Sequence, residues 1–230
     1  MLTGLCLLAL LGGCSATPKA AVPAALTGQA APVVQDAQGL AVVRATAFAA
    51  RWPRGQHAWQ TRANAAAAGG VNLVALQDVN TTLDANLETL SPRLDYPVQF
   101  VRAGTHYVWV HGQAAPQAGG NGDSLHVGLN QQPVRSARRI TGFGSLYRWA
   151  NRTMGGPVAT LSVAAPGLYT LNVWMREDGM RFDGLAVSSS PRFVPTATTL
   201  AAAPVPAAPA PPSSPAPTII STPAAFSAQA

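Results

Sequence analysis

The feature that most constrains the fold of this chain is a series of short, alternating apolar segments separated by glycine and proline. The clearest segment spans residues 93–100, where alternate positions are apolar: Leu94, Tyr96, Val98 and Phe100. Similar alternation recurs in residues 106–111, 125–129, 159–163, 169–175 and 185–187. Short strands at this spacing, joined by Gly and Pro turns, predict an all-β fold of the jelly-roll β-sandwich type. Pro97 falls on the polar side of its segment and predicts a sheet edge or a bulge there.

The first 14 residues have the pattern of a bacterial lipoprotein signal peptide. An apolar run at residues 5–11 is too short to span a bilayer and leads into a lipobox that ends at Cys14. The sequence therefore predicts lipidation of Cys14 and a place in the bacterial cell envelope, held to a membrane outside the cytoplasm. An ordinary secretory signal is the alternative, and the run is not preceded by Lys or Arg.

Composition divides the rest of the chain into three parts. Residues 15–38 are rich in Ala, Pro, Thr, Val and Gln with almost no charge, and are expected to form a flexible tether. Residues 39–195 carry the strand patterns and are expected to form one domain. Residues 196–230 are rich in Pro and Ala and predict a disordered tail, because proline interrupts helices and sheets.

Several motifs of the strand region resemble one family. They are a strand–turn–strand pattern with an acidic turn in residues 170–187 and glycine-bounded strands at 106–112 and 122–129. Together these segments resemble the C-terminal domain of family 115 glycoside hydrolases, a group similar to calcium-containing carbohydrate-binding modules. The resemblance implies a galactose-binding-like β-sandwich that binds glycan at its surface. Residues 65–68 favour a helix by propensity, whereas the resemblance implies a glycine-rich loop leading to a strand at 71–76, which we favour.

Two further segments match the family at positions that imply ligand binding. Residues 147–151 carry its tryptophan-x-asparagine pattern as Trp149 and Asn151, and residues 54–60 carry its glycine-histidine-alanine-tryptophan pattern as His57 and Trp59. Sugar-binding modules use aromatic faces because pyranose C–H groups pack against them, while amides read the hydroxyls. These four residues are therefore the candidate binding residues. The alternatives are a loop anchor for Trp149 and a buried, hydrogen-bonded histidine for His57.

The resemblance also implies a structural calcium ion, but the ligands are incomplete. Asp183 matches the family's last-strand aspartate, whereas Arg44 and Thr46 stand where the first strand is expected to carry glutamates. Calcium needs several hard oxygen ligands. We therefore expect no cofactor and no tight calcium site, and a possible pairing of Arg44 with Asp183.

The net charge of +6 does not by itself indicate a nucleic-acid partner. The arginines are scattered except for a cluster at residues 135–139, which lies outside any recognisable DNA- or RNA-binding motif. A short basic loop of this kind is more typical of a solvated surface. We expect no nucleic-acid partner.

Catalysis is not indicated by the acidic residues. The chain has only nine Asp and Glu residues, and Glu177 and Asp178 are adjacent in a turn, whereas glycosidases use two carboxylates that flank the bond. The sequence thus predicts non-catalytic binding of a polysaccharide or cell-surface glycan by an envelope-anchored domain. An envelope structural or adhesion scaffold without a sugar ligand is the alternative.

Overall fold

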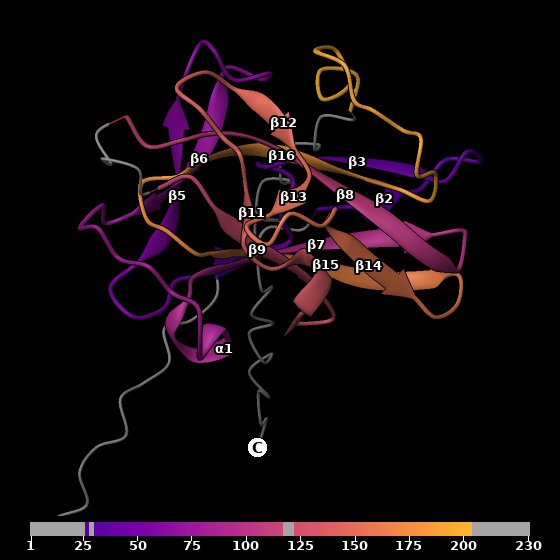
Figure 1. The fold of residues 1–230 in the computed structure, drawn as a ribbon, viewed down its shortest axis with the longest axis horizontal. Coiled ribbons are helices and arrows are strands. Elements are labelled where there is room, and N and C mark those ends of the chain that lie inside the picture. Colours follow the sequence, from indigo (N-terminus) through magenta and orange to yellow (C-terminus); the bar gives the residue numbers. More distant parts are fainter. Residues whose placement is uncertain (1–25, 28–29, 117–121, 204–230) are drawn as a thin grey trace, which may run out of the picture.

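Two β-sheets lie face to face across a shared hydrophobic core (Figure 1). The computed structural model describes residues 26–27, 30–116 and 122–203. The prediction of an all-β jelly-roll sandwich is confirmed. No helix among the described residues is long and apolar enough to cross a membrane.

The first sheet has the strand order β1-β4-β7-β15-β9-β11-β13, with β2 added to β7 and β10 to β9. Its strands are β1 (Leu26–Thr27), β2 (Val33–Val34), β4 (Ala50–Trp52), β7 (Arg93–Phe100), β9 (Leu125–Leu129), β10 (Gln132–Pro133), β11 (Ile140–Thr141), β13 (Arg152–Thr153) and β15 (Gly167–Met175). All pairs are antiparallel except β2 with β7.

The second sheet has the order β12-β8-β16-β6-β5, with β14 added to β8 and β3 to β16. Its strands are β3 (Leu40–Arg44), β5 (Ala58–Ala63), β6 (Val71–Leu76), β8 (Gly104–Gln113), β12 (Arg148–Ala150), β14 (Thr160–Val163) and β16 (Arg181–Ser188). Two short helices complete the described elements, α1 (Leu87–Leu90) and the 3₁₀ turn η1 (Arg135–Ala137).

Strand β7 shows how the alternating pattern produces the core. Its apolar side chains, predicted to share one face, are all fully buried: Leu94, Tyr96, Val98 and Phe100. Strand β15 pairs with β7 along its whole length, but on the other side β4 reaches only Asp95 and β2 begins at Val98. Pro97 lies in the gap between them, as its missing N–H requires.

The acidic turn predicted between two strands connects the two sheets. Strand β15 belongs to the first sheet and β16 to the second, so Glu177, Asp178 and Gly179 lie in a crossing and not in a hairpin. Gly179 has a positive φ of 74°, a conformation that glycine adopts without strain. The Asp178 carboxylate accepts the backbone N–H of Thr81 at 2.9 Å, which fixes the crossing to the loop after β6.

The ambiguous region before β6 is a turn followed by a strand. The backbone N–H of Asn64 donates to the Gly70 carbonyl at 2.9 Å. The side-chain oxygen of Asn64 accepts the N–H of Ala66 at 3.1 Å. This closed turn takes the place of the helix that the alanines favour. The strand expected at residues 71–76 is confirmed as β6.

The fold extends beyond both predicted boundaries of the domain. Within the expected tether, β2 pairs with β7, and the Gln35 side chain is buried and accepts the backbone N–H of Val101 at 2.9 Å. Within the expected tail, Leu200 is only 1% exposed. The tether and tail predictions are therefore corrected at residues 30–38 and 196–203, where tertiary contacts outweigh composition. The signal peptide, Cys14, most of the tether and residues 204–230 lie outside the described residues.

Candidate functional site

Trp149 lies on β12 at one edge of the second sheet. It pairs with His111 of β8, and the centroids of the two rings are 4.9 Å apart. Its side chain is half-buried, and its indole N–H donates to the Thr196 carbonyl at 3.1 Å. Asn151 is the residue between β12 and β13, and its backbone carbonyl accepts the N–H of Ala159 at 2.7 Å. Trp149 and Asn151 therefore stand where the chain passes from one sheet to the other.

An aromatic cluster, formed by His111, Tyr147 and Trp149, lies on the outer face of this sheet. The rings of His111 and Tyr147 stack with centroids 5.5 Å apart. The Tyr147 hydroxyl accepts the side-chain amide of Asn64 at 3.1 Å. Burial, together with the nearby Asp183 charge, raises the pKa of Tyr147 to about 12, so its hydroxyl stays protonated at neutral pH.

Residues 196–203, which we call the C-terminal segment, pack against the same face. Leu200 lies so close to Gly184 that a Cβ there would meet its side chain at 2.5 Å. The Arg44 guanidinium donates to the carbonyl oxygens of Ala201 at 2.7 Å and Ala203 at 3.2 Å. The chain itself thus covers part of the surface beside Trp149.

Trp59 and His57 do not join Trp149. Trp59 is fully buried, donates to the Pro92 carbonyl at 3.1 Å and meets the Phe182 ring edge-on at 6.0 Å. Its strand, β5, and β12 are the opposite ends of the sheet order, with three strands between them, a separation of about 19 Å at ordinary strand spacing. The structure thus corrects the assignment of Trp59 to a binding surface, because no part of its ring is open to a ligand.

His57 adopts the alternative of a buried, hydrogen-bonded histidine. It is 8% exposed, and its Nε2 atom lies 3.3 Å from the Asp178 carboxylate. Asp178 also binds backbone amides of the loop after β6. His57 therefore supports the crossing between the sheets and faces no cleft with Trp149.

Asp183 is occupied by protein donors. Its Oδ2 atom accepts the His111 Nδ1 hydrogen at 2.8 Å and the N–H of Ala68 at 2.9 Å. Arg44 binds the C-terminal segment, so the pairing suggested for Arg44 and Asp183 is not formed. Among the described residues no group of three or more His, Cys, Asp or Glu could hold a metal ion. With an imidazole beside one carboxylate and arginine on the first strand, these residues do not fit calcium.

Glu177 and Asp178, the adjacent acidic residues of the crossing, are both buried and hydrogen-bonded. Glu177 forms an ion pair with Arg176 and accepts the hydroxyl of Ser124 at 2.8 Å. Asp178 accepts backbone amides and lies against His57. Neither carboxylate is free to reach a substrate.

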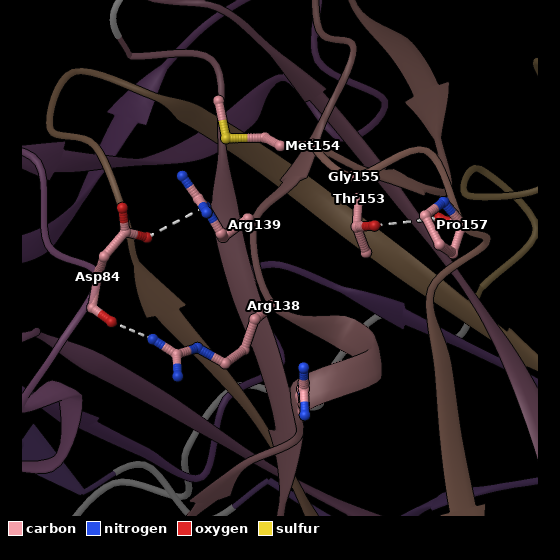
Figure 2. Close-up of a pocket in the computed structure, with 8 residues that line it drawn as sticks. Asp84, Arg138, Arg139, Thr153, Met154, Gly155 and Pro157 are labelled. Carbon is pink, nitrogen blue, oxygen red and sulfur yellow. Dashed lines mark hydrogen bonds and ion pairs between the residues drawn. The ribbon is translucent and has the colours of Figure 1, made fainter.

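A pocket of about 530 Å³ lies at the β11–β13 end of the first sheet (Figure 2). We call it the arginine pocket. Three segments that are far apart in the sequence contribute its lining residues, which are Asp84, Arg135, Arg138, Arg139, Thr153, Met154, Gly155 and Pro157. Figure 2 shows Asp84 on one side, Arg138 and Arg139 next to it, and the turn from Thr153 to Pro157 beyond them. This turn follows Asn151 within two residues, so the predicted binding segment provides one wall.

Asp84 organises the charged side of the pocket. The Arg176 guanidinium donates to both Asp84 carboxylate oxygens, at 3.0 and 3.2 Å, from the protein interior. Arg139 lies 3.4 Å from the same carboxylate, and Arg138 donates to the Asp84 carbonyl. The hydrogen bond from Arg176 is the main reason that the pKa of Asp84 is lowered, so this carboxyl is ionised at neutral pH.

The sequence predicts a solvated surface for the arginine cluster at residues 135–139. The structure instead makes it one wall of a concavity, because Asp84 and residues 153–157 approach it from elsewhere in the chain. The available signal was the close spacing of Arg135, Arg138 and Arg139 just before the Trp149 segment. Concavity itself depends on tertiary contacts that the spacing does not encode.

Comparison with known families places this fold. Residues 35–190 match the family described as the glycosyl hydrolase family 115 C-terminal domain. The chain belongs to this family. This match confirms the resemblance that the strand motifs indicated. The match ends before the C-terminal segment.

Individual relatives are more distant. The chain is 32% identical over 111 residues to an uncharacterized protein, P23, of Formosa agariphila; the match covers 44% of this chain and only 26% of the relative. A family 35 carbohydrate-binding module from Clostridium thermocellum is similar at 15% identity and a TM-score of 0.43, over 66% of this chain and 98% of that one. The C-terminal family 6 module of a laminarinase from Zobellia galactanivorans is similar at 11% identity and a TM-score of 0.41, over 65% and 99%.

Proposed function

We propose that this domain binds a polysaccharide without cleaving it, and that the arginine pocket is the binding site. The observation that carries the proposal is an open concavity of about 530 Å³ built from three loops, in a member of a glycosyl hydrolase C-terminal domain family. Small-ligand sites have volumes of this order. Asn151 contributes by holding the turn that forms one wall.

The acidic residues support a non-catalytic role. Glycosidases need an acid and a base or nucleophile on either side of the bond. Among the described residues, Asp84 is the only carboxylate that lines the pocket, and Arg176 binds both of its oxygens. Glu177 and Asp178 are buried in the crossing between the sheets. The pocket therefore offers contacts to a ligand but no acid–base pair.

Retention of the full chain on a panel of soluble and insoluble polysaccharides tests this proposal. Gly155→Trp is the pocket variant, because a Cβ at Gly155 meets only Pro157, at 3.7 Å, and a bulky ring there fills the concavity. Trp149→Ala is the matched variant of the aromatic cluster. We expect retention on at least one glycan, lost in Gly155→Trp and kept in Trp149→Ala. Loss in Trp149→Ala alone would move the site to the aromatic cluster.

The scaffold without a sugar ligand has a specific observation in its favour. Of the four residues that the sequence assigned to binding, Trp59 and His57 are buried and Trp149 is held by the C-terminal segment. An interaction surface that has lost its ligand has these properties. Absence of retention on every polysaccharide by a folded chain would favour this alternative over glycan binding.

We further propose that Cys14 is lipidated and anchors the domain to the cell envelope, outside the cytoplasm. The support is the lipobox of residues 11–14. In bacterial cells, Cys14→Ala is expected to abolish incorporation of labelled palmitate and to move the chain from the membrane fraction to the soluble fraction. Cys6→Ala is the matched control and is expected to change neither. Equal labelling of both variants would contradict the anchor.

A further inference from the structure

The charged wall of the arginine pocket has more positive than negative groups facing the concavity. Among the described residues, three guanidinium groups and one carboxylate, that of Asp84, line it. Arg176 binds both Asp84 oxygens from the interior side and is also paired with Glu177, which does not line the pocket. The pocket is thus left with a positive potential, which attracts an anionic ligand.

Two of these guanidinium groups retain unused donors. The Nε atom of Arg138 is buried and has no hydrogen-bond partner among the described residues. Arg135 is exposed, and its side chain makes no hydrogen bond or ion pair within the part of the chain that the structure describes. Guanidinium groups bind carboxylate and sulfate-like oxyanions through paired N–H groups.

Apolar side chains complete the lining of the pocket. Met154, which is 45% exposed, lies beside Arg139, whose carbonyl accepts the Met154 N–H at 2.9 Å, and Pro157 lies farther from the arginines (Figure 2). Thr153 closes the turn by donating its hydroxyl hydrogen to the Pro157 carbonyl at 3.3 Å. Apolar side chains such as these can pack against the C–H face of a sugar ring. A lone phosphate or a metal ion would make no such contact.

The arginine wall is held rigidly. Ala137, between the arginines, is fully buried in the core, and the Ser136 hydroxyl donates to the Thr160 carbonyl at 2.7 Å. The backbone N–H of Arg139 donates to His126 Nδ1 at 3.0 Å. Because their backbone is already fixed, ligand binding restricts only the side chains of the arginines.

From these observations we propose that the arginine pocket binds an anionic substituent, a carboxylate or a sulfate group, on the sugar ring of an acidic polysaccharide, with Arg135 and Arg138 as the binding residues. The inference rests on the proposed function, because it names the ligand class of the same pocket. A nucleic acid is the less suitable polyanion here, since the pocket is a single concavity without exposed aromatic rings among its lining residues.

Two pairs of polysaccharides, each matched in backbone, test the charge requirement with the full chain. Polygalacturonate is compared with its methyl-esterified form for the carboxylate, and dextran sulfate with dextran for the sulfate. We expect binding to at least one charged member at low salt, and binding to its neutral partner to be weaker by about tenfold or more. The preferred pair identifies the anionic group.

Arginine variants locate the binding. Arg135→Gln and Arg138→Gln are each expected to weaken binding by about tenfold. Arg192→Gln removes the same charge from an exposed site outside the pocket and is expected to change affinity less than about twofold. Because Arg135 is exposed, its substitution leaves the fold intact even if Arg138→Gln unfolds the loop, and thermal unfolding of each variant checks this.

The outcomes distinguish failure of the anionic-ligand inference from failure of the proposed polysaccharide binding. Equal binding of charged and neutral polysaccharides that Gly155→Trp abolishes would overturn the anionic ligand and leave the proposed function standing. An equal loss in Arg192→Gln would overturn the pocket as the anion site. Tighter binding of duplex DNA than of every acidic polysaccharide, dependent on Arg135, would overturn the glycan as the ligand. Failure to bind any polysaccharide would overturn both proposals.

Discussion

His126 joins the two sides of the arginine pocket through its two ring nitrogens. Its Nδ1 atom accepts the N–H of Arg139, so the hydrogen must be on Nε2, which donates to the Leu83 carbonyl at 2.9 Å. Leu83 precedes Asp84 in the sequence and Arg139 follows Arg138, so both partners of His126 adjoin residues that line the pocket. Burial is the main reason that the pKa of His126 is lowered to about 4. A neutral imidazole with one fixed tautomer therefore holds the loop before Asp84 against the arginine loop.

The lowered pKa of His126 predicts a loss of stability in mild acid. As pH falls from 6.5 towards 4, the unfolded chain binds a proton at this position and the folded chain does not, so the free energy of unfolding decreases. Between pH 7 and 4.5 the contribution is about 2–3 kcal/mol. Urea unfolding at both pH values is expected to show this excess loss in the natural chain relative to His126→Gln. Equal losses in the two proteins would contradict a buried neutral histidine.

At the scale of elements, the sequence predicts the long strands well. Strand β7 alternates over all eight of its residues, and a period of two identifies both the strand and its buried face. Shorter alternating stretches, residues 106–111 and 169–175, lie within β8 and β15. Strand β5 gives no such signal, because Trp59 is its only buried residue. The burial of Trp59 was therefore not readable from the sequence, and a solvent-exposed ring was the wrong expectation.

The order of the elements and the candidate site were less predictable than the elements themselves. That β15 and β16 belong to opposite sheets follows from pairing with β7 and β8, which lie far away in the sequence. The segment of Trp149 and Asn151 directly precedes residues 153–157, which line the arginine pocket. The sequence does not predict the arginine pocket beside it, because this pocket forms only where residues 84, 135–139 and 153–157 meet.

The whole molecule extends further along the chain than composition suggests. A Pro- and Ala-rich stretch cannot form its own core, but it can add to an existing one. Gln35 does so through hydrogen bonds to the amides of Val101 and Arg102, at 2.9 and 3.2 Å. Leu200 does so at the other end by packing on Gly184, where only glycine leaves room for its side chain. Both contacts lie close to or beyond the limits of the family match, residues 35–190.

These contacts predict that a fragment of residues 30–203 is more stable than one of residues 39–195. The shorter fragment loses β2, the buried amide of Gln35 and the buried Leu200. At about 1 kcal/mol for each hydrogen bond and about 2 kcal/mol for a buried leucine, the free energy of unfolding should fall by at least about 3 kcal/mol. Urea unfolding of both fragments measures this difference. Gln35→Ala and Leu200→Ala in the full chain divide it between the two ends, whereas equal stability of the fragments would mean that the fold ends where the composition changes.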